Sequence, residues 1–274
     1  MRVAVVQFAA GAVKSANLAR LRELVSRAAE DGAELIVAPE AAMLPFGRPE
    51  DPLAAAAETL RGPFVTGLGE VAAARNVTVL AGMFETVPGD PSRAFNTVVA
   101  LGPGGLLGRY RKLHLFDALG WAESDRLVPG EFDGTELLAF DCGELRIGVL
   151  TCYDVRFPEL TRVLVDQGVT VFALPAAWVA GPGKEDQWAT LVRARAIEST
   201  CYIVAADQCA PTYAGTSMIV DPLGVPLAQA SYGEGIAIGE VSAARVAAVR
   251  RQMPSLRHRR FRVQPGDPAV SSGW

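Results

Sequence analysis

Cys152 lies where a protein would hold a nucleophile. Residues 144–160 read ELRIGVLTCYDVRFPEL, so a strand-like run ends in a tight Thr-Cys-Tyr-Asp turn and Phe157-Pro158 opens a helix. Proline is favoured at a helix start because its missing N–H is not needed there. A thiol between the strand and the helix sits at the mouth of a sheet rather than inside it. We therefore predict a cysteine nucleophile, although an unpaired cysteine is also commonly a packing residue.

The other three cysteines lack this setting. Cys142 precedes a glycine turn, Cys201 lies in the apolar run CYIVAADQ, and Cys209 follows that run. A thiol in such a run usually acts as a small hydrophobic group. Scattered cysteines without CxxC spacing predict neither a zinc site nor a disulfide framework. We therefore expect no metal, and a reducing, cytoplasmic setting.

A cysteine nucleophile needs a proton acceptor, since a free thiol with a pKa of about 8.5 is only slightly ionised at neutral pH. The chain has two histidines. His258 lies in the basic run RQMPSLRHRRFR, which suits a solvated surface, and His114 in YRKLHLFD stays open as a partner. The local cysteine signature of a papain-like site is absent.

Glu40 is the carboxylate in the most suggestive place. The run ELIVAPE ends on Glu40, and the small, apolar AAMLPF follows. A charge flanked by core-like residues is costly unless it is paired, and burial raises a carboxyl pKa toward the range useful for proton transfer. We predict that Glu40 is the base, the alternative being that it caps a loop at the surface.

Lys112 supplies a candidate positive charge in GRYRKLHLFD. Alternation places Tyr110, Lys112 and His114 on the side opposite Arg111 and Leu113. The ammonium is then free to face a carbonyl oxygen attacked by Cys152. The alternative is a solvated charged face shared with the neighbouring arginines.

Composition limits the class of protein. The chain has 274 residues, of which 50% are apolar and 20% charged, and a net charge of -4. This charge offers no general field for nucleic acid or an anionic membrane, and the basic run from Arg250 to Arg262 does not change that. The N-terminus reads straight into a strand without signal-peptide regions, and no apolar run is long enough to span a membrane. We expect a small molecule or a second copy of the chain as partner.

Strand-like and helical segments alternate along the chain. Nine strand-like runs include RVAVVQF, LRIGVLTCY and VTVFALPAAW, and residues 15–31 and 184–200 show helical patterns. Such alternation predicts a layered α/β fold with helices on both outer faces. The glycine-rich GPGGLLG at 102–108 lacks the GK[ST] ending of a phosphate loop and predicts a hairpin turn. We expect one domain over residues 1–262 and a polar C-terminal tail over 263–274.

Taken together, these segments resemble the nitrilase superfamily of carbon-nitrogen hydrolases. The likeness runs from VAVVQF and LIVAPE through FNTVVALGPGGLLGRYRKLHLFD, TCYDVRFPEL and RARAIE to GTSMIVDPLG. It implies a four-layer αββα sandwich, a homodimer or larger homo-oligomer, no cofactor, and a triad of Glu40, Lys112 and Cys152. A second active-site glutamate falls on Glu123 in GWAESDRLVPG, a segment shorter than in close relatives. Gln187 stands where many relatives carry histidine.

The resemblance suggests a mechanism in which Glu40 takes the thiol proton as sulfur attacks an amide carbonyl. Lys112 and the backbone N–H of Tyr153 then hold the oxyanion, and ammonia leaves a thioester that water hydrolyses. Glu123 orients Lys112 and the leaving nitrogen.

Two further residues are candidates for substrate binding. Motifs around Cys152 resemble the omega-amidase and deaminated-glutathione amidase branch, whose substrates are small amides that carry a carboxylate. Arg156 is a candidate partner of that carboxylate. Its alternative is an ion pair with Glu159 or Asp154. Trp178 lines the pocket or belongs to the core.

The sequence leaves two related activities open. Glu40, Lys112 and Cys152 would serve equally in an N-carbamoyl amine hydrolase or a true nitrilase. A non-catalytic scaffold with the same fold is less consistent with a carboxylate, an amine and a thiol kept together. Arg193, Arg195 and Glu198 share a helix at spacings that predict an internal ion pair.

Overall fold

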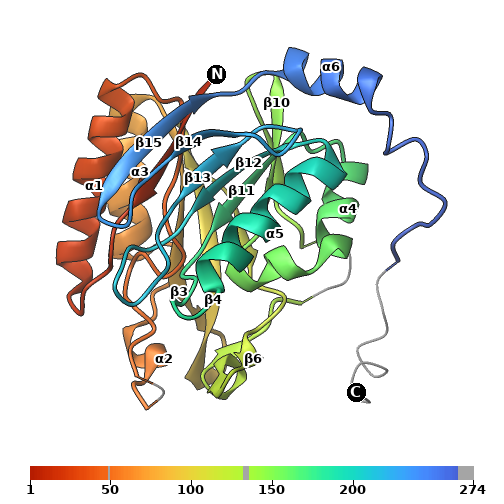
Figure 1. Ribbon diagram of the computed structural model, residues 1–274. Coiled ribbons are helices and arrows are strands. Elements are labelled where there is room, and N and C mark those ends of the chain that lie inside the picture. Colours follow the sequence, from red (N-terminus) through yellow and green to blue (C-terminus); the bar gives the residue numbers. More distant parts are fainter. Residues whose placement is uncertain (49, 132–135, 265–274) are drawn as a thin grey trace.

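Two mixed sheets lie face to face in the centre of the molecule (Figure 1). The computed structural model describes residues 1–48, 50–131 and 136–264. In the first sheet β1, β2 and β3 are parallel, the pairs β15–β1, β3–β4 and β4–β5 are antiparallel, and β8 pairs with β4 in parallel. Its order is β15 (Gly235–Glu240), β1 (Arg2–Gln7), β2 (Leu35–Val37), β3 (Thr78–Val87), β4 (Asp90–Gly102) and β5 (Gly105–Arg111), with the short β8 (Leu127–Val128) also beside β4.

The second sheet repeats this plan. Its central strands β10, β11 and β12 are parallel, with antiparallel strands on both sides. Its order is β14 (Pro226–Gln229), β13 (Met218–Val220), β12 (Tyr202–Ala206), β11 (Val171–Pro175), β10 (Leu145–Val149) and β9 (Ala139–Cys142).

Both faces of the first sheet are apolar because both are covered. In β1, Val3 and Val5 join the cluster that reaches the second sheet, whereas Ala4 and Val6 join the cluster beneath the helices. Strands buried on both faces read as continuous apolar runs, which is why RVAVVQF lacks polar alternation.

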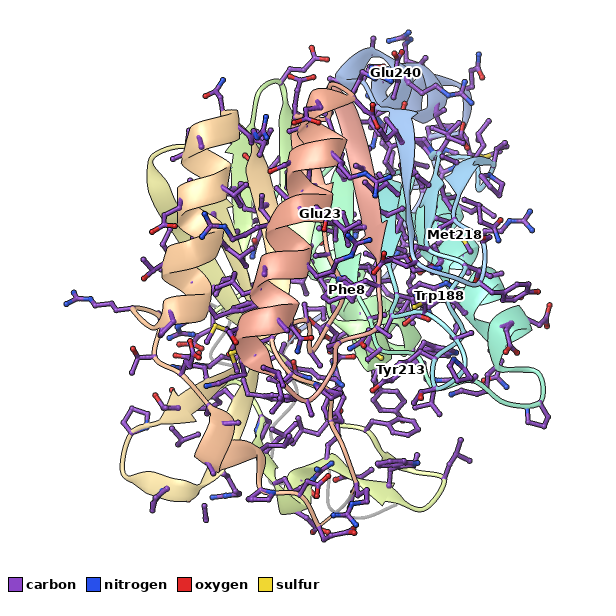
Figure 2. The ribbon with its side chains drawn as sticks, turned by 90° about the vertical axis from the view of Figure 1, so that its left-hand side faces the viewer. Phe8, Glu23, Trp188, Tyr213, Met218 and Glu240 are labelled. Carbon is purple, nitrogen blue, oxygen red and sulfur yellow. The ribbon has the colours of Figure 1, made fainter. Side chains whose placement is uncertain are left out.

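Helices complete the two outer layers. The helices α1 (Lys14–Glu30) and α3 (Pro63–Arg75) cover the first sheet, and α4 (Pro158–Asp166) and α5 (Lys184–Ser199) cover the second. Figure 2 shows Glu23 on α1 in the front layer, and Trp188 and Met218 farther back on the side of the second sheet. The predicted αββα sandwich is confirmed.

The remaining elements are short or lie at the edges. They are α2 (Leu53–Ala56), the two-residue strands β6 (Asp117–Ala118) and β7 (Trp121–Ala122), α6 (Ala243–Gln252), and 3-10 turns at Glu123–Asp125 and Cys152–Arg156.

Most predicted elements are present. All nine strand-like runs contain a strand, and the two helical patterns correspond to α1 and α5 within one residue at each end. The glycine-rich segment forms the predicted hairpin turn between β4 and β5. Most of the predicted tail, residues 265–274, lies outside the described residues, so the tail stays a prediction. Within the described ranges, no helix is long and apolar enough to cross a membrane.

Candidate active site

A sharp turn holds Cys152 at the end of β10. The backbone leaves the sheet at Leu150, and a 3-10 turn begins at Cys152, whose φ of 45° is left-handed. A non-glycine residue rarely adopts this conformation, which costs about 1–3 kcal/mol and persists only where the surroundings impose it. Cys152 is 8% exposed. The predicted strand, turn and helix are all present, because α4 begins at Pro158.

Asp154 imposes that turn. Its fully buried carboxylate accepts hydrogen bonds from the Thr151 N–H (2.9 Å) and the Tyr110 hydroxyl (2.7 Å). The ring of His114 lies 2.7 Å from the same carboxylate through Nδ1 and stacks on Phe157. His114 therefore contacts the nucleophile turn through Asp154.

Glu40 is buried at the end of the segment that follows β2. Its side chain is fully covered, so the surface-cap alternative is wrong. Oε1 accepts hydrogen bonds from Lys112 Nζ (3.0 Å) and Asn96 Nδ2 (2.7 Å), and Oε2 accepts one from the Ala177 N–H (2.9 Å). Four separate segments therefore meet at one carboxylate.

Gly82 allows β3 to approach Glu40 closely. A Cβ at this position would lie 2.5 Å from the backbone nitrogen of Ala41 and 2.6 Å from the Cα of Glu40. Real Cβ atoms essentially never come this near to backbone. Only glycine fits here without displacing Glu40.

Lys112 follows β5 and is 1% exposed, so the solvated-face alternative is wrong for this residue. Its Nζ lies 2.9 Å from Glu123 Oε2 and 3.0 Å from Glu40 Oε1. Arg111 points to the other side, as alternation predicts, and pairs with Glu85 at 2.6 Å. Lys112 thus bridges two carboxylates.

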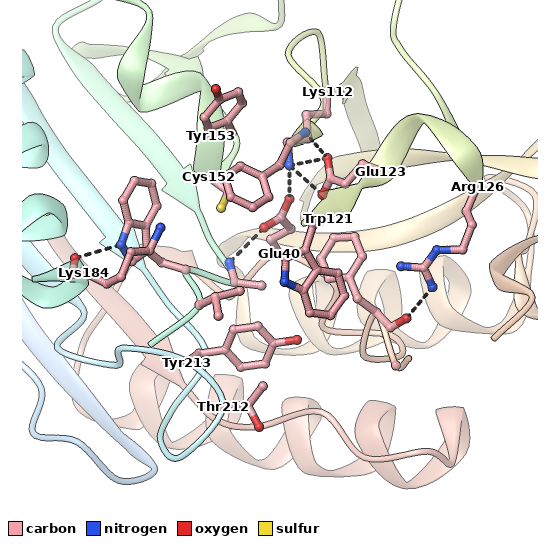
Figure 3. A pocket seen from close by; sticks show the side chains of 16 residues that line it. Glu40, Lys112, Trp121, Glu123, Arg126, Cys152, Tyr153, Lys184, Thr212 and Tyr213 are labelled. Carbon is pink, nitrogen blue, oxygen red and sulfur yellow. Dashed lines mark hydrogen bonds and ion pairs between the residues drawn. The ribbon is translucent and has the colours of Figure 1, made fainter. Parts of the chain in front are cut away.

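Glu123 begins the 3-10 turn after β7. It is 7% exposed, and its Oε2 also accepts a hydrogen bond from the Phe116 N–H at 2.8 Å. Although its segment is short, it reaches Lys112. The structure thus brings Glu40, Lys112 and Glu123 into one hydrogen-bonded group beside Cys152 (Figure 3).

The charges of this group act on one another. Burial raises the pKa of the Cys152 thiol well above its usual value, Glu40 raises it further, and Lys112 offsets part of the rise. Burial opposes the charge on Lys112, but Glu123 and Glu40 outweigh it and lift its pKa well above the usual range. Burial also raises the pKa of Glu123 against the pull of Lys112. These shifts favour the charged form of Lys112 and the protonated form of the Cys152 thiol.

An inner pocket with a free volume of about 100 Å³ opens onto these residues, and a larger outer groove of about 610 Å³ lies beside it. Tyr153 and Lys184 line both spaces, Trp178 lines the inner pocket, and Arg156 lines the outer groove. Figure 3 shows Lys184 on one side of Cys152 and Arg126 on the other.

Arg156 makes neither of the ion pairs that the sequence left open. Instead its guanidinium donates to Gln187 Oε1 at 2.7 Å and lies over the Trp178 ring at 4.9 Å. Within the described ranges it pairs with neither Glu159 nor Asp154. The pair between Arg195 and Glu198 is present at 2.6 Å, as predicted.

Trp178 is both a core residue and a pocket-lining residue, the two alternatives that the sequence left open. It is 3% exposed and packs against Trp188, as a core residue would, and it also lines the inner pocket. Its backbone N–H donates to Asp207 and its indole N–H to the Lys184 carbonyl. These two bonds fix the ring at the pocket wall.

Sequence reasoning missed several lining residues. Phe116 and Arg126 line the inner pocket from the segments that also carry Lys112 and Glu123, and Tyr213 lines it from a segment with no recognisable motif. Lys184 is different, since a lysine at the first position of a helix opposes the helix dipole and was a usable signal. His258 is exposed on the surface. Among the described residues no group of His, Cys, Asp and Glu forms a metal site.

Comparison with known proteins places this geometry in a family. The sequence profile named Carbon-nitrogen hydrolase matches residues 2–251. A deaminated glutathione amidase of Escherichia coli O157:H7 is 40% identical over 261 residues, covering 95% of this chain and 98% of the relative. An omega-amidase of Homo sapiens is 32% identical over 272 residues, covering 94% of this chain and 95% of the relative.

Solved structures agree. A CN-hydrolase superfamily protein from Xanthomonas campestris superposes with a TM-score of 0.86 at 26% identity, covering 97% of this chain and 99% of that one. The NitN amidase from Nesterenkonia sp. AN1 gives 0.80 at 25% identity, covering 95% and 96%. The chain belongs to the carbon-nitrogen hydrolase family. It is an enzyme, an amidase that cleaves C–N bonds, and the predicted resemblance is confirmed.

Proposed function

We propose that this enzyme hydrolyses a small, carboxylate-bearing amide, with Cys152 as nucleophile and Glu40 as general base. The observation that carries the proposal is the buried chain of hydrogen bonds from Glu40 through Lys112 to Glu123, at the pocket that contains Cys152. Burying two carboxylates and an ammonium costs desolvation free energy, which their mutual ion pairs offset only in part. Buried ionisable groups that face a pocket are therefore typical of a catalytic site.

In the first half-reaction the thiol proton moves to Glu40 as Sγ bonds to the amide carbon. The electron pair of the C=O double bond moves to the oxygen, which faces the Lys112 ammonium and the N–H of Tyr153. That N–H belongs to the first turn of the 3-10 helix, where amides have no partner within the helix. The C–N bond then breaks, Glu40 returns its proton to nitrogen, and ammonia leaves a thioester.

In the second half-reaction Glu40 takes a proton from water, whose oxygen attacks the thioester carbon. The oxyanion forms again in the same place, the C–S bond breaks, and the sulfur recovers the proton from Glu40. Glu123 is the positioning residue for Lys112. General-base action and one oxyanion donor are each typically worth about 10²-fold or more in rate.

The substrate class follows from size and charge. A small inner pocket suits a primary amide head, and the cations Lys184 and Arg156 suit an anion at its other end. A deaminated glutathione amidase and an omega-amidase stand among the relatives of this chain. We infer an amide of the omega type, with the amide and a carboxylate on one molecule.

A side-by-side substrate panel tests this function. Purified enzyme is offered monoamides of dicarboxylic acids, an N-carbamoyl amino acid and a simple nitrile, and ammonia, carbon dioxide and acid are measured. We expect ammonia and acid from the monoamides alone. Carbon dioxide, or turnover of the nitrile alone, contradicts the proposal, and Cys152→Ala shows that any activity belongs to this protein.

We further propose that the chain acts as a homodimer or larger homo-oligomer in the cytoplasm, as one domain over residues 1–262. The exposed Leu223, Val225 and Leu227 on and beside edge strand β14 support self-association, and the four free thiols support a reducing setting. Light scattering after gel filtration tests assembly, and cell fractionation tests location.

A further inference from the structure

Lys184 is a buried cation without a counter-charge. The chain has three lysines. Lys14 pairs with Glu58 at 2.8 Å and Lys112 with Glu40 and Glu123, whereas within the described ranges no carboxylate lies within ion-pairing distance of Lys184. Yet Lys184 is only 9% exposed. A buried charge normally has a partner, so a missing one is a sign of a ligand.

Aromatic rings hold the ammonium in place. Its Nζ lies 4.3 Å from the centre of the Trp178 ring and 5.5 Å from that of Phe116. Contacts of this kind stabilise a cation without neutralising it. Asp207 is close enough to influence the ammonium but lies outside ion-pairing distance, and it accepts hydrogen bonds from the Trp178 and Gln208 N–H groups.

The backbone adds to the positive field. Lys184 is the first residue of the 16-residue helix α5, where the helix dipole is positive. A cation there is unfavourable, and Arg156 repels it further. Gly181 and Pro182 from the loop before this helix and Gln187 from its first turn line the outer groove. An anion in this space would meet the helix start, Lys184 and Arg156 together.

The other cations around the pocket already hold partners within the protein. Lys112 holds two carboxylates, Arg156 donates to Gln187 through Nη2, and Arg126 donates through Nη1 to the carbonyls of Phe46, Arg48 and Asp51. In the described part of the chain, Lys184 is the pocket cation whose side chain donates no hydrogen bond.

We propose that Lys184 binds the carboxylate of the substrate while the amide lies at Cys152. The inference rests on the proposed amidase function. Because ammonia is the leaving group, this carboxylate belongs to the acyl part and stays bound through the thioester. Lys184 therefore selects monoamides of dicarboxylic acids over uncharged amides, and Arg156 assists from the outer groove.

The test measures a selectivity ratio. Wild type, Lys184→Met and Lys184→Arg are each assayed on glutaramate and on valeramide, which replaces the far carboxylate with a methyl group. Methionine is an unbranched side chain one atom shorter than lysine, so it keeps most of the apolar stem and removes the charge. We expect Lys184→Met to lower the ratio of kcat/KM values about 10- to 100-fold, mainly through KM, because a hydrogen bond to a charged group is lost. Lys184→Arg should keep most of the ratio.

The outcomes separate the two proposals. If wild type hydrolyses neither amide, the proposed function fails. If it hydrolyses both without preference, the amidase stands and the role of Lys184 is wrong. An equal loss on both amides in Lys184→Met would mean a structural role, and a larger change in ratio for Arg156→Met would move the carboxylate to the outer groove. Lys184→Gln repeats the test if the methionine variant does not fold.

Discussion

The Cys152 thiol lies among charges of opposite sign, and the effects that raise its pKa are larger than the effect that lowers it. Burial and Glu40 raise the pKa of the thiol, and Lys112 offsets only part of the rise. A preformed thiolate would add a second net negative charge to a buried group that already contains two carboxylates and one ammonium. In the proposed mechanism the thiolate is therefore made during attack, by transfer of the thiol proton to Glu40.

The first prediction concerns that pKa. In Glu40→Gln the negative neighbour of the thiol is gone, so the pKa of Cys152 should fall, and thiolate should appear at lower pH than in wild type. Turnover should nevertheless drop at least about 10²-fold because the base is lost. A titration of thiolate ultraviolet absorbance, with Cys152→Ala in the same background as the blank, measures the shift. An unchanged or higher pKa would mean that Glu40 does not act on the thiol.

A second prediction concerns cooperation among the residues. Glu40→Gln and Lys112→Met should each lower kcat nearly as much as Cys152→Ala, since each member of such a group achieves little alone. Steady-state ammonia release measures this, with circular dichroism to show that each variant is folded. Glu123→Gln should be milder, because Lys112 keeps its bond to Glu40. If Lys112→Met lowered kcat only slightly, the ammonium of Lys112 would not be the group that stabilises the oxyanion.

The third prediction separates an enzyme from an inert scaffold. Iodoacetamide should modify Cys152 much faster than Cys142, Cys201 or Cys209, because only Cys152 has a base beside it in an open pocket. Burial raises the pKa of all four thiols, so the difference in rate should come from Glu40 beside Cys152 and not from a lower thiol pKa. Peptide mass spectrometry at short times measures the four rates, and equal, slow labelling would favour the scaffold.

At the scale of elements, the close approach of β3 at Gly82 positions Glu40, the proposed base. Gly82→Ala should push the segment that carries Glu40 away from β3, with a loss of about 1–3 kcal/mol in the free energy of unfolding. A displacement of about 1 Å in a catalytic group costs about 10²-fold in rate, so kcat should also fall. Gly104→Ala is the matched control, since nothing lies within 4 Å of its added Cβ. Equal behaviour of the two variants in urea titrations and assays would contradict this account.

The nucleophile turn depends on Asp154 in a similar way. Asp154→Ala should lower the free energy of unfolding by about 3 kcal/mol, because it leaves the Thr151 N–H and the Tyr110 hydroxyl buried without a partner. Asp141→Ala removes an exposed pair with Arg146 and should change stability by less than about 0.5 kcal/mol. Urea denaturation compares them. A small effect of Asp154→Ala would mean that the turn at Cys152 does not depend on the hydrogen bonds of Asp154.

Sequence patterns predict the elements that local rules govern. Continuous apolar runs identify the strands, and Pro158 marks the start of α4. The strands β5, β9 and β14 are harder, because they are partly exposed and lack such runs. Contacts between distant segments leave no local trace. Two examples are the hydrogen bond from Asn96 to Glu40, 56 positions apart, and the one from Tyr110 to Asp154, 44 positions apart.

At the scale of the whole molecule, the two sheets share one apolar core. The cluster between them contains Val3 and Leu35 from the first sheet with Ile147 and Val171 from the second. We therefore expect a single unfolding transition. Tryptophan fluorescence, which reports on the buried Trp178 and Trp188, should give the same midpoint as far-ultraviolet circular dichroism. Two separated midpoints would mean that the chain divides into two units.

Family membership is what the sequence predicts best at this scale, since motifs in order along the chain imply one fold. Selectivity is predicted least well. Arg156 attracts attention because it follows the nucleophile by four positions, whereas Lys184, which lies deeper, comes 32 residues after Cys152 and is brought to it only by folding. The distinction depends on burial and on free donors, which a sequence does not display.

The sharing of one ammonium by two carboxylates also bears on the release of product. A neutral amide can approach Glu40 and Glu123 without electrostatic opposition, but its hydrolysis creates a new anion between them and the sulfur. That anion is repelled by the same two groups that helped to make it. A diacid product would thus be attracted at the Lys184 end and expelled at the other, so the charge balance favours turnover over product inhibition.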